Sequence, residues 1–234
     1  MRLHYIQPLL YVCFFISFLS CKMDKPTPVI EDKTAKQEQK KEDNLLEALD
    51  TETGVQDLTI WHSPKILIQQ LGDLSDKIVA NIGAGPYGYF SFQIVDKAKK
   101  VIAIDIDPSA IDFIENQREQ LLPSALQNKL ETRLVEPDNP KLRFEEADIV
   151  TIMDTYAYLP NRIEYLKNLR RGIVSGGKLL IVDFKMRKLP VGPPQAEKVP
   201  LFQVELDLVK AGYRIEWVDD RSFTYRYLLL AVNP

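Results

Sequence analysis

Lys77-Ile-Val-Ala-Asn-Ile-Gly-Ala-Gly-Pro-Tyr-Gly88 is the segment of the sequence that is most informative about the fold. It reads as a short buried strand that runs into a glycine-rich loop, and the sequence after Gly88 is typical of a helix. Glycines let a backbone approach a ligand closely, and the first N–H groups of a helix are free to bind one. Loops of this kind serve several ligands, and a glycine turn needed only for tight packing is the alternative.

Around this stretch, short apolar runs alternate with segments of helical periodicity. We predict strands at 77–82, 101–104, 130–135, 149–153, 178–183, 213–218 and 225–232. Helices are predicted at 61–71, at 89–98, from Pro108 onward, at 162–171 and at 201–211. Such alternation indicates a parallel sheet with helices on both faces.

The end of the chain departs from this alternation. About six residues separate the last two predicted strands, which is too short for the crossover that parallel neighbours need. We therefore expect these two strands to be antiparallel. The predicted fold class is α/β, a Rossmann-like three-layer sandwich with a mostly parallel seven-stranded sheet and an antiparallel last strand.

The N-terminal segment has the features of an export signal. Arg2 and His4 precede an apolar run at 9–19, which ends in Leu19-Ser20-Cys21. A basic start, a short apolar run and a small residue before the cut are typical of a secretory signal. The run is shorter than the ~20 residues of a transmembrane helix. Leu-Ser-Cys resembles the lipobox of bacterial lipoproteins, which implies lipidation of Cys21; an uncleaved anchor and a plain signal peptide are the alternatives.

Three parts of the chain follow from this pattern. Residues 1–20 are predicted to be the signal peptide, and residues 21–57 a lipidated cysteine with a charged linker. The linker is rich in Lys, Glu, Asp, Gln, Thr and Pro, a composition that buries too little apolar surface to order itself. Residues 58–234 are predicted to form the domain. The expected location is an exported, membrane-anchored protein facing the periplasm or the cell surface.

Composition excludes several kinds of partner. The formal net charge is -3, whereas a protein that neutralises many phosphates is expected to be basic, so we expect no nucleic acid. The chain has two cysteines and two histidines, of which Cys13, Cys21 and His4 lie in the N-terminal segment. A disulfide framework and a Cys/His zinc site are therefore excluded on count. No metal is expected, although the count does not exclude a site made of carboxylates alone.

Asp105 is the second candidate for ligand binding. It ends the predicted strand after the glycine loop, about twenty residues downstream, where a carboxylate can accept the ribose hydroxyls of an adenosine ligand. Asp107 precedes Pro108 and is expected to cap the helix that begins there.

Taken in order, the motifs resemble those of class I S-adenosylmethionine-dependent methyltransferases. The first two are Ile82-Gly-Ala-Gly85 with Gly88-Tyr-Phe-Ser-Phe92, and Ile102-Ala-Ile-Asp-Ile-Asp-Pro108. The others are Trp61 with Pro64, Glu136–Leu142, Asp154-Thr-Tyr156, Gly176–Phe184 and Pro190–Pro194. The resemblance implies S-adenosylmethionine as cofactor and a methyl acceptor, for which a small molecule is the default expectation.

The resemblance also implies roles for single residues. The residues that it places at the cofactor are Asn81, Gly83, Ala84, Gly85, Asp105, Ile106 and Glu136. Asp154 and Tyr156 would orient the methyl acceptor as the catalytic residues. For Glu136 an exposed loop carboxylate is the alternative, and for Asp154 a helix or turn cap.

The sequence departs from the family at three places. Asn81 stands where the family usually has an acidic residue, Tyr87 looks like an extra residue in the loop, and Ala157-Tyr158 replaces frequent histidines. Two other functions therefore stay open. One is a non-catalytic binding or scaffold lipoprotein of this fold, because the cofactor is made in the cytoplasm. The other is an NAD(P)-binding oxidoreductase, because residues 83–88 also satisfy G-x-G-x-x-G.

Overall fold

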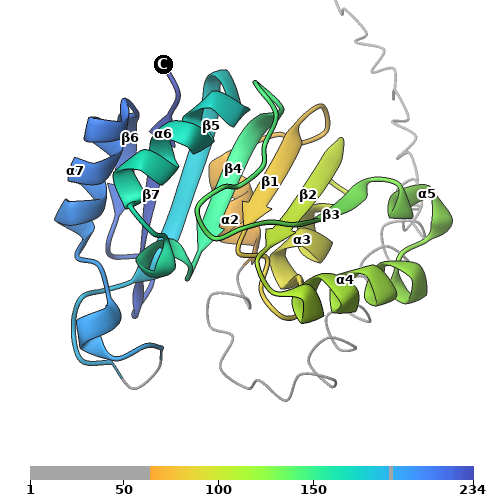
Figure 1. Ribbon diagram of the computed structural model, residues 1–234, viewed down its shortest axis with the longest axis horizontal. Helices are drawn as coiled ribbons and strands as arrows, with labels where there is room; N and C mark the ends of the chain where they lie inside the picture. Colours follow the sequence, from red (N-terminus) through yellow and green to blue (C-terminus); the bar gives the residue numbers. More distant parts are fainter. Residues whose placement is uncertain (1–63, 190–191) are drawn as a thin grey trace, which may run out of the picture.

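A seven-stranded sheet forms the centre of the molecule in the computed structural model, which describes residues 64–189 and 192–234 (Figure 1). The strands are β1 (Ile78–Ile82), β2 (Lys100–Asp105), β3 (Leu130–Leu134), β4 (Ala147–Met153), β5 (Ile173–Phe184), β6 (Arg214–Asp219) and β7 (Arg226–Val232). Their order across the sheet is β3-β2-β1-β4-β5-β7-β6. Neighbours from β3 to β5 are parallel, and β7 is antiparallel to both β5 and β6. The predicted fold class is confirmed.

Helices cover both faces of this sheet, and each follows or precedes a strand. They are α2 (Pro64–Leu71), α3 (Tyr89–Ile94), α4 (Pro108–Leu121), α5 (Ser124–Gln127), α6 (Arg162–Gly172) and α7 (Leu201–Ala211). Two single 3-10 turns, η1 (Tyr156–Tyr158) and η2 (Gln195–Glu197), lie after β4 and after β5. The carboxyl ends of the parallel strands meet at the lower edge in Figure 1.

Two apolar layers lie between the sheet and its helices. Strand β5 supplies both because successive side chains point to opposite faces. Leu180 and Val182 pack in the layer that contains residues of α2, α3 and α4, whereas Leu179 and Ile181 pack in the layer with α6 and α7. All four side chains have no exposed surface. This burial on both faces explains why the strand is a continuous apolar run in the sequence.

The structure shortens one predicted helix and shows the course of the connection between β3 and β4. Helix α3 ends at Ile94 rather than at 98, because the N–H of Lys97 bonds to the Ile94 carbonyl at 3.1 Å and tightens the chain into a turn. Residues 135–146 connect β3 to β4 without a helix. This connection packs on the end of α6, where the N–H of Glu145 donates to the carbonyl of Arg171 at 2.9 Å.

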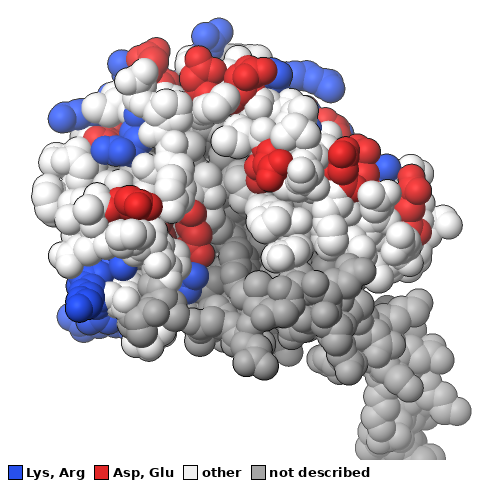
Figure 2. All heavy atoms as spheres, turned by 60° about the horizontal axis from the view of Figure 1, so that its bottom comes forward, with Lys and Arg blue, Asp and Glu red and all other residues white. Residues whose placement is uncertain are grey.

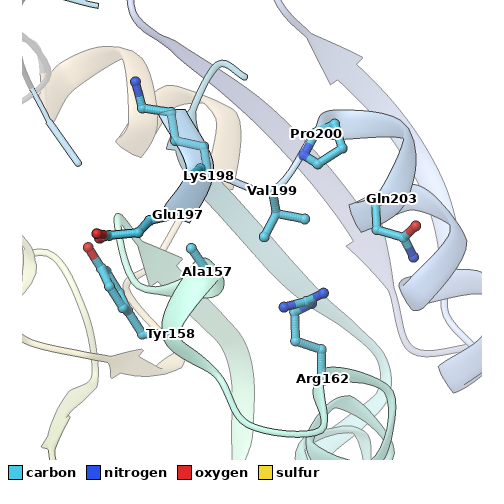
Figure 3. Close-up of a pocket in the computed structure, with 9 residues that line it drawn as sticks. Ala157, Tyr158, Arg162, Glu197, Lys198, Val199, Pro200 and Gln203 are labelled. Carbon is cyan, nitrogen blue, oxygen red and sulfur yellow. The ribbon is translucent and has the colours of Figure 1, made fainter. Parts of the chain in front are cut away.

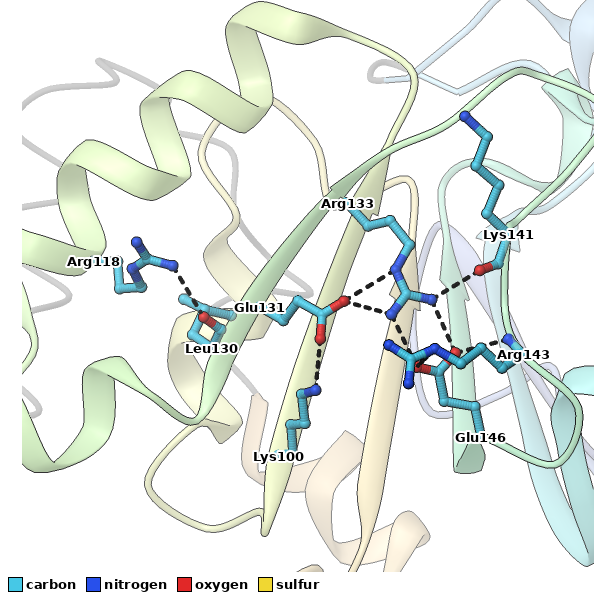
Figure 4. Close-up of polar contacts among 8 residues, drawn as sticks. All are labelled: Lys100, Arg118, Leu130, Glu131, Arg133, Lys141, Arg143 and Glu146. Carbon is cyan, nitrogen blue, oxygen red and sulfur yellow. Dashed lines mark hydrogen bonds and ion pairs between the residues drawn. The ribbon is translucent and has the colours of Figure 1, made fainter.

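A charged network fastens the edge strand β3 to the connection that follows it (Figure 4). Arg133 of β3 donates from both terminal nitrogens to Glu146, each at 2.9 Å, and also pairs with Glu131. Lys100 of β2 pairs with the other oxygen of Glu131. The guanidinium lowers the pKa of Glu146 to about 2. Charged side chains along an edge strand also discourage pairing with another chain.

The predicted signal peptide, Cys21 and the linker lie outside the described residues, as does Trp61, so these stay predictions. Within 64–189 and 192–234, no helix is both long enough and apolar enough to cross a membrane.

Candidate cofactor and acceptor site

The glycine loop between β1 and α3 is held by its neighbours in the sheet. Gly83 and Gly85 have φ values of +67° and +76°, which residues with a side chain rarely adopt. The N–H of Ala84 donates to the carbonyl of Ile104 at 3.0 Å. A Cβ on Gly83 would lie 2.3 Å from Oγ1 of Thr155, so the loop is packed directly against the segment after β4. The loop is therefore fixed in place by β2 and β4.

Asp105, at the end of β2, lies beneath this loop. Its Oδ2 accepts the N–H of Gly85 at 2.8 Å, and its Oδ1 accepts those of Ile106 at 2.7 Å and Asp107 at 3.0 Å. A carboxylate offers about four acceptor positions, so these bonds leave about one for a ligand. Asp105 thus builds the loop and keeps capacity for a ribose hydroxyl. Asp107 caps α4 through Ser109, as predicted.

Asn81 lies below the loop and is almost fully buried. Its Nδ2 donates to Ser91 Oγ at 3.2 Å, and its Oδ1 accepts the hydroxyl of Thr151 at 2.9 Å. The amide joins β1 to α3 and to β4 without bringing a charge into the interior. Asn81 therefore positions the loop from below.

The space above the loop is not filled by Tyr87. The Tyr87 ring packs edge-on against Phe113 of α4, with ring centroids 5.6 Å apart. Within the described residues, a Cβ on Gly85 would meet no atom closer than 4 Å. Ile106, beside Asp105, is 55% exposed although it is apolar. Among the described residues, Gly85 and the Ile106 side chain are therefore accessible beside the Asp105 carboxylate.

Glu136 lies past the end of β3 and is exposed. It opens a short turn in which the N–H of Asn139 donates to the Glu136 carbonyl at 3.1 Å. The turn follows the strand next to β2, so Glu136 shares the carboxyl edge of the sheet with Asp105.

Asp154 stands at the end of β4 in a left-handed backbone conformation, with φ of +51°. Its carboxylate binds Arg226 through two hydrogen bonds of 2.8 Å each, to Nε and Nη2. The Arg226 guanidinium lies 4.1 Å above the centre of the Phe184 ring. Arg226 is 72 residues away in the sequence, and no local pattern singled it out.

The predicted role of Tyr156 in orienting the methyl acceptor does not agree with its position in the structure. Its side chain is fully buried, and its hydroxyl donates to Asp207 of α7 at 3.0 Å. Burial and the adjacent Asp207 carboxylate raise the pKa of this phenol far above its ordinary value. A hydroxyl with no access from outside cannot orient a methyl acceptor, so Tyr156 acts as a core residue that connects η1 to α7.

Asp183 is a buried acid that the sequence did not single out. It lies at the end of β5 with 3% of its surface exposed, and among the described residues its Oδ2 has no hydrogen-bond partner. Burial, reinforced by the charge of Asp154, raises its pKa to about 6. The motif that contains it, Gly176–Phe184, was predicted as a strand and contributed to the family resemblance, but a buried acid at a strand end has no sequence signature of its own.

Figure 2 turns the carboxyl edge of the sheet toward the viewer. On the described part of this face, acidic side chains are scattered, and basic side chains gather at the lower left. In this view the described surface is hollowed between the left and the right part of the molecule.

Part of the sequence and the fold of the chain are similar to those of known methyltransferases. Residues 80–181, from β1 to β5, match the family described as a methyltransferase domain. No curated protein matches the sequence. A SAM-dependent methyltransferase from Aquifex aeolicus has a similar structure, with 22% identity, a TM-score of 0.67, and coverage of 74% of this chain and 90% of that chain.

Two further structures show how widely the fold is used. Geranyl diphosphate C-methyltransferase from Streptomyces coelicolor A3(2), solved with S-adenosyl-L-homocysteine, has 10% identity and a TM-score of 0.61 over 74% of this chain and 78% of that one. The [4+2]-cyclase SpnF has 11% identity and a TM-score of 0.62 over 74% of this chain and 81% of its own. The chain thus has the Rossmann-like fold of S-adenosylmethionine-dependent methyltransferases, and its central segment matches the methyltransferase-domain family.

Proposed function

We propose that the protein is an S-adenosylmethionine-dependent methyltransferase that acts on a small molecule. The observation that carries the proposal is the 2.8 Å bond from the Gly85 N–H to Asp105, which forms a cradle from the glycine loop and the end of β2. The family match over residues 80–181 includes both parts of this cradle.

The residues of the cradle fit an adenosine-containing cofactor. Gly83, Ala84 and Gly85 would hold its methionine and ribose part, and Asp105 would accept a ribose hydroxyl. The exposed side chain of Ile106 offers an apolar surface for the adenine. When bound, the cofactor supplies a methyl group on a sulfonium, which is already a good leaving group.

Positioning of the acceptor can then provide most of the acceleration. Asp154 is the residue that would orient the acceptor, since it is 22% exposed by its side chain and stands at the carboxyl edge. Arg226 holds both of its oxygens, which fixes the direction of the carboxylate. Arg226 is thus a positioning residue.

Calorimetric titration of the full-length chain with S-adenosylhomocysteine tests this proposal. We expect binding that Ile106→Asp weakens about tenfold, because a carboxylate replaces the apolar contact. Val209→Asp is the matched control, because Val209 is also exposed but lies on α7. No heat with either S-adenosylmethionine or S-adenosylhomocysteine would leave a non-catalytic binding or scaffold protein as the function.

We further propose that lipidation of Cys21 tethers the domain to a membrane at the periplasmic or cell-surface face. The apolar run at 9–19 followed by Leu-Ser-Cys supports this. Metabolic labelling with palmitate should be lost in Cys21→Ala and kept in Cys13→Ala. Labelling that persists in Cys21→Ala would refute the tether.

A further inference from the structure

A pocket opens next to the residues that follow β4, near Asp154. Its volume is about 600 Å³, within the range of pockets that hold small molecules. The walls come from η1, from the first residue of α6, from η2 and from the start of α7 (Figure 3). Ala157 and Tyr158 of its wall follow Asp154 by only a few residues, so the pocket adjoins the carboxyl end of β4.

Two cations line this pocket, Arg162 and Lys198, and the Lys198 ammonium donates to the carbonyl of Arg187 at 3.0 Å. Arg162 is the one whose charged end points into the pocket. Its Nε donates to Oδ2 of Asp207 at 3.2 Å, and its guanidinium lies 5.9 Å from the centre of the Tyr156 ring. Within the part of the chain that the structure describes, its two terminal nitrogens have no hydrogen-bond partner. Figure 3 shows the guanidinium directed toward the space below Val199. The free pair of N–H groups has the planar geometry that binds a carboxylate through two parallel hydrogen bonds.

Buried Asp207 holds this guanidinium in place. Its carboxylate is 3% exposed and also accepts the Tyr156 hydroxyl at 3.0 Å and the amide of Gln203 at 2.8 Å. Gln203 itself lines the pocket. Because Tyr156 and Gln203 hold the Asp207 carboxylate, and Asp207 holds Arg162, the cation is oriented before any ligand arrives, which lowers the cost of binding.

The opposite wall has a different character. Glu197 and Tyr158 lie side by side there, with the carboxylate near the phenol oxygen (Figure 3). Ala157 and Val199 make the surface between the two walls apolar. A ligand with a second negative charge would meet Glu197, whereas a neutral or cationic end would not be repelled.

We propose that this pocket binds a small monocarboxylate, with the carboxylate on Arg162 and a neutral or cationic end toward Glu197. The role of this ligand rests on the proposed methyltransferase function, under which the monocarboxylate is the methyl acceptor. The pocket itself is defined by contacts that involve no cofactor residue, so its ligand can be tested separately.

Saturation-transfer NMR on the full-length chain in a non-ionic detergent provides that test, with benzoate as probe. Benzamide has nearly the same shape without the charge, and terephthalate adds a second carboxylate. We expect saturation transfer to benzoate, none or much less to benzamide, and weaker binding of terephthalate that Glu197→Gln restores. Equal signals for benzoate and benzamide would overturn the proposal.

Two variants locate the binding. Arg162→Gln should weaken benzoate binding by about tenfold or more, because two charge-assisted hydrogen bonds are lost. Arg171→Gln, at the other end of α6 and exposed, should leave it unchanged. Ala157→Leu narrows the pocket without touching the Arg162–Asp207 pair, so it tests the site even if Arg162→Gln does not fold.

The outcomes separate this proposal from the preceding one. Benzoate binding that survives both Arg162→Gln and Ala157→Leu, or no benzoate binding at all, refutes the carboxylate pocket. Benzoate binding in a chain that does not bind S-adenosylhomocysteine leaves the pocket intact and removes only its link to methyl transfer.

Discussion

Replacing Gly83 by alanine tests the packing of the glycine loop against β4. The new Cβ would lie 2.3 Å from Oγ1, 2.6 Å from Cγ2 and 2.9 Å from Cβ of Thr155, at a φ of +67°. Gly85 is the matched control, because its φ of +76° is similar but, among the described residues, its Cβ would meet nothing within 4 Å.

The two substitutions should differ in free energy. Both place an alanine in the left-handed region, which costs about 1–2 kcal/mol. Gly83→Ala adds an overpacking cost of roughly 1–3 kcal/mol. It also displaces the Thr155 hydroxyl from the Met153 carbonyl, now 2.8 Å away, at a cost of about 1 kcal/mol. We expect Gly83→Ala to be more destabilising than Gly85→Ala by about 2 kcal/mol or more.

Urea unfolding of the full-length chain, followed by circular dichroism, measures these costs. Thr155→Gly removes all three atoms that the new Cβ would meet, so Gly83→Ala should cost about 2 kcal/mol less in that background. Equal costs for the two glycines, or no coupling with Thr155→Gly, would show that the loop does not pack on β4 as described.

Three further predictions concern charge and capping. The pKa of Glu146 in the folded protein is lowered from 4.5 to about 2, so its contribution to stability is present above pH 4.5 and is lost as the pH falls toward 2. Urea unfolding at several pH values in this range should show a contribution of about 1–2 kcal/mol, which is already reduced for solvent screening. The Glu146→Gln variant should lack this contribution. The pKa of Asp183 in the folded protein is raised from 3.8 to about 6, so the free energy of unfolding should fall as the pH rises between these values. In urea unfolding at pH 8, Asp183→Asn should be roughly 2 kcal/mol more stable than the native chain. Equal stability of the two proteins at pH 8 would contradict this prediction. Asp107→Ala removes the cap on α4 and should cost about 1 kcal/mol in thermal unfolding, which Asp107→Ser should largely restore.

The strands and the direction of β7 could be predicted from the sequence because each depends on local patterns. Strand β5 is recognisable as an apolar run, and α7 begins and ends at the predicted residues, Leu201 and Ala211. The antiparallel pairing of β7 follows from the length of the preceding connection alone. By contrast, the course of residues 135–146 between β3 and β4 could not be predicted from local patterns, because this connection is held by a contact with α6.

The candidate site likewise contains residues that local sequence patterns predicted and residues that only the structure identified. Gly83, Gly85 and Asp105 are recognisable from spacing because the loop and the strand end that form the cradle are about twenty residues apart and belong to one βαβ unit. Local patterns were therefore enough to predict the fold class and to single out the glycine loop and Asp105, which the structure joins by a hydrogen bond. Only the tertiary structure decided that Asp154 binds Arg226, that Tyr156 is buried on Asp207, and that Arg162 faces a pocket. Those pairs join strands and helices 45 to 72 residues apart, and partners at such distances are chosen by how the layers pack, which no local pattern encodes.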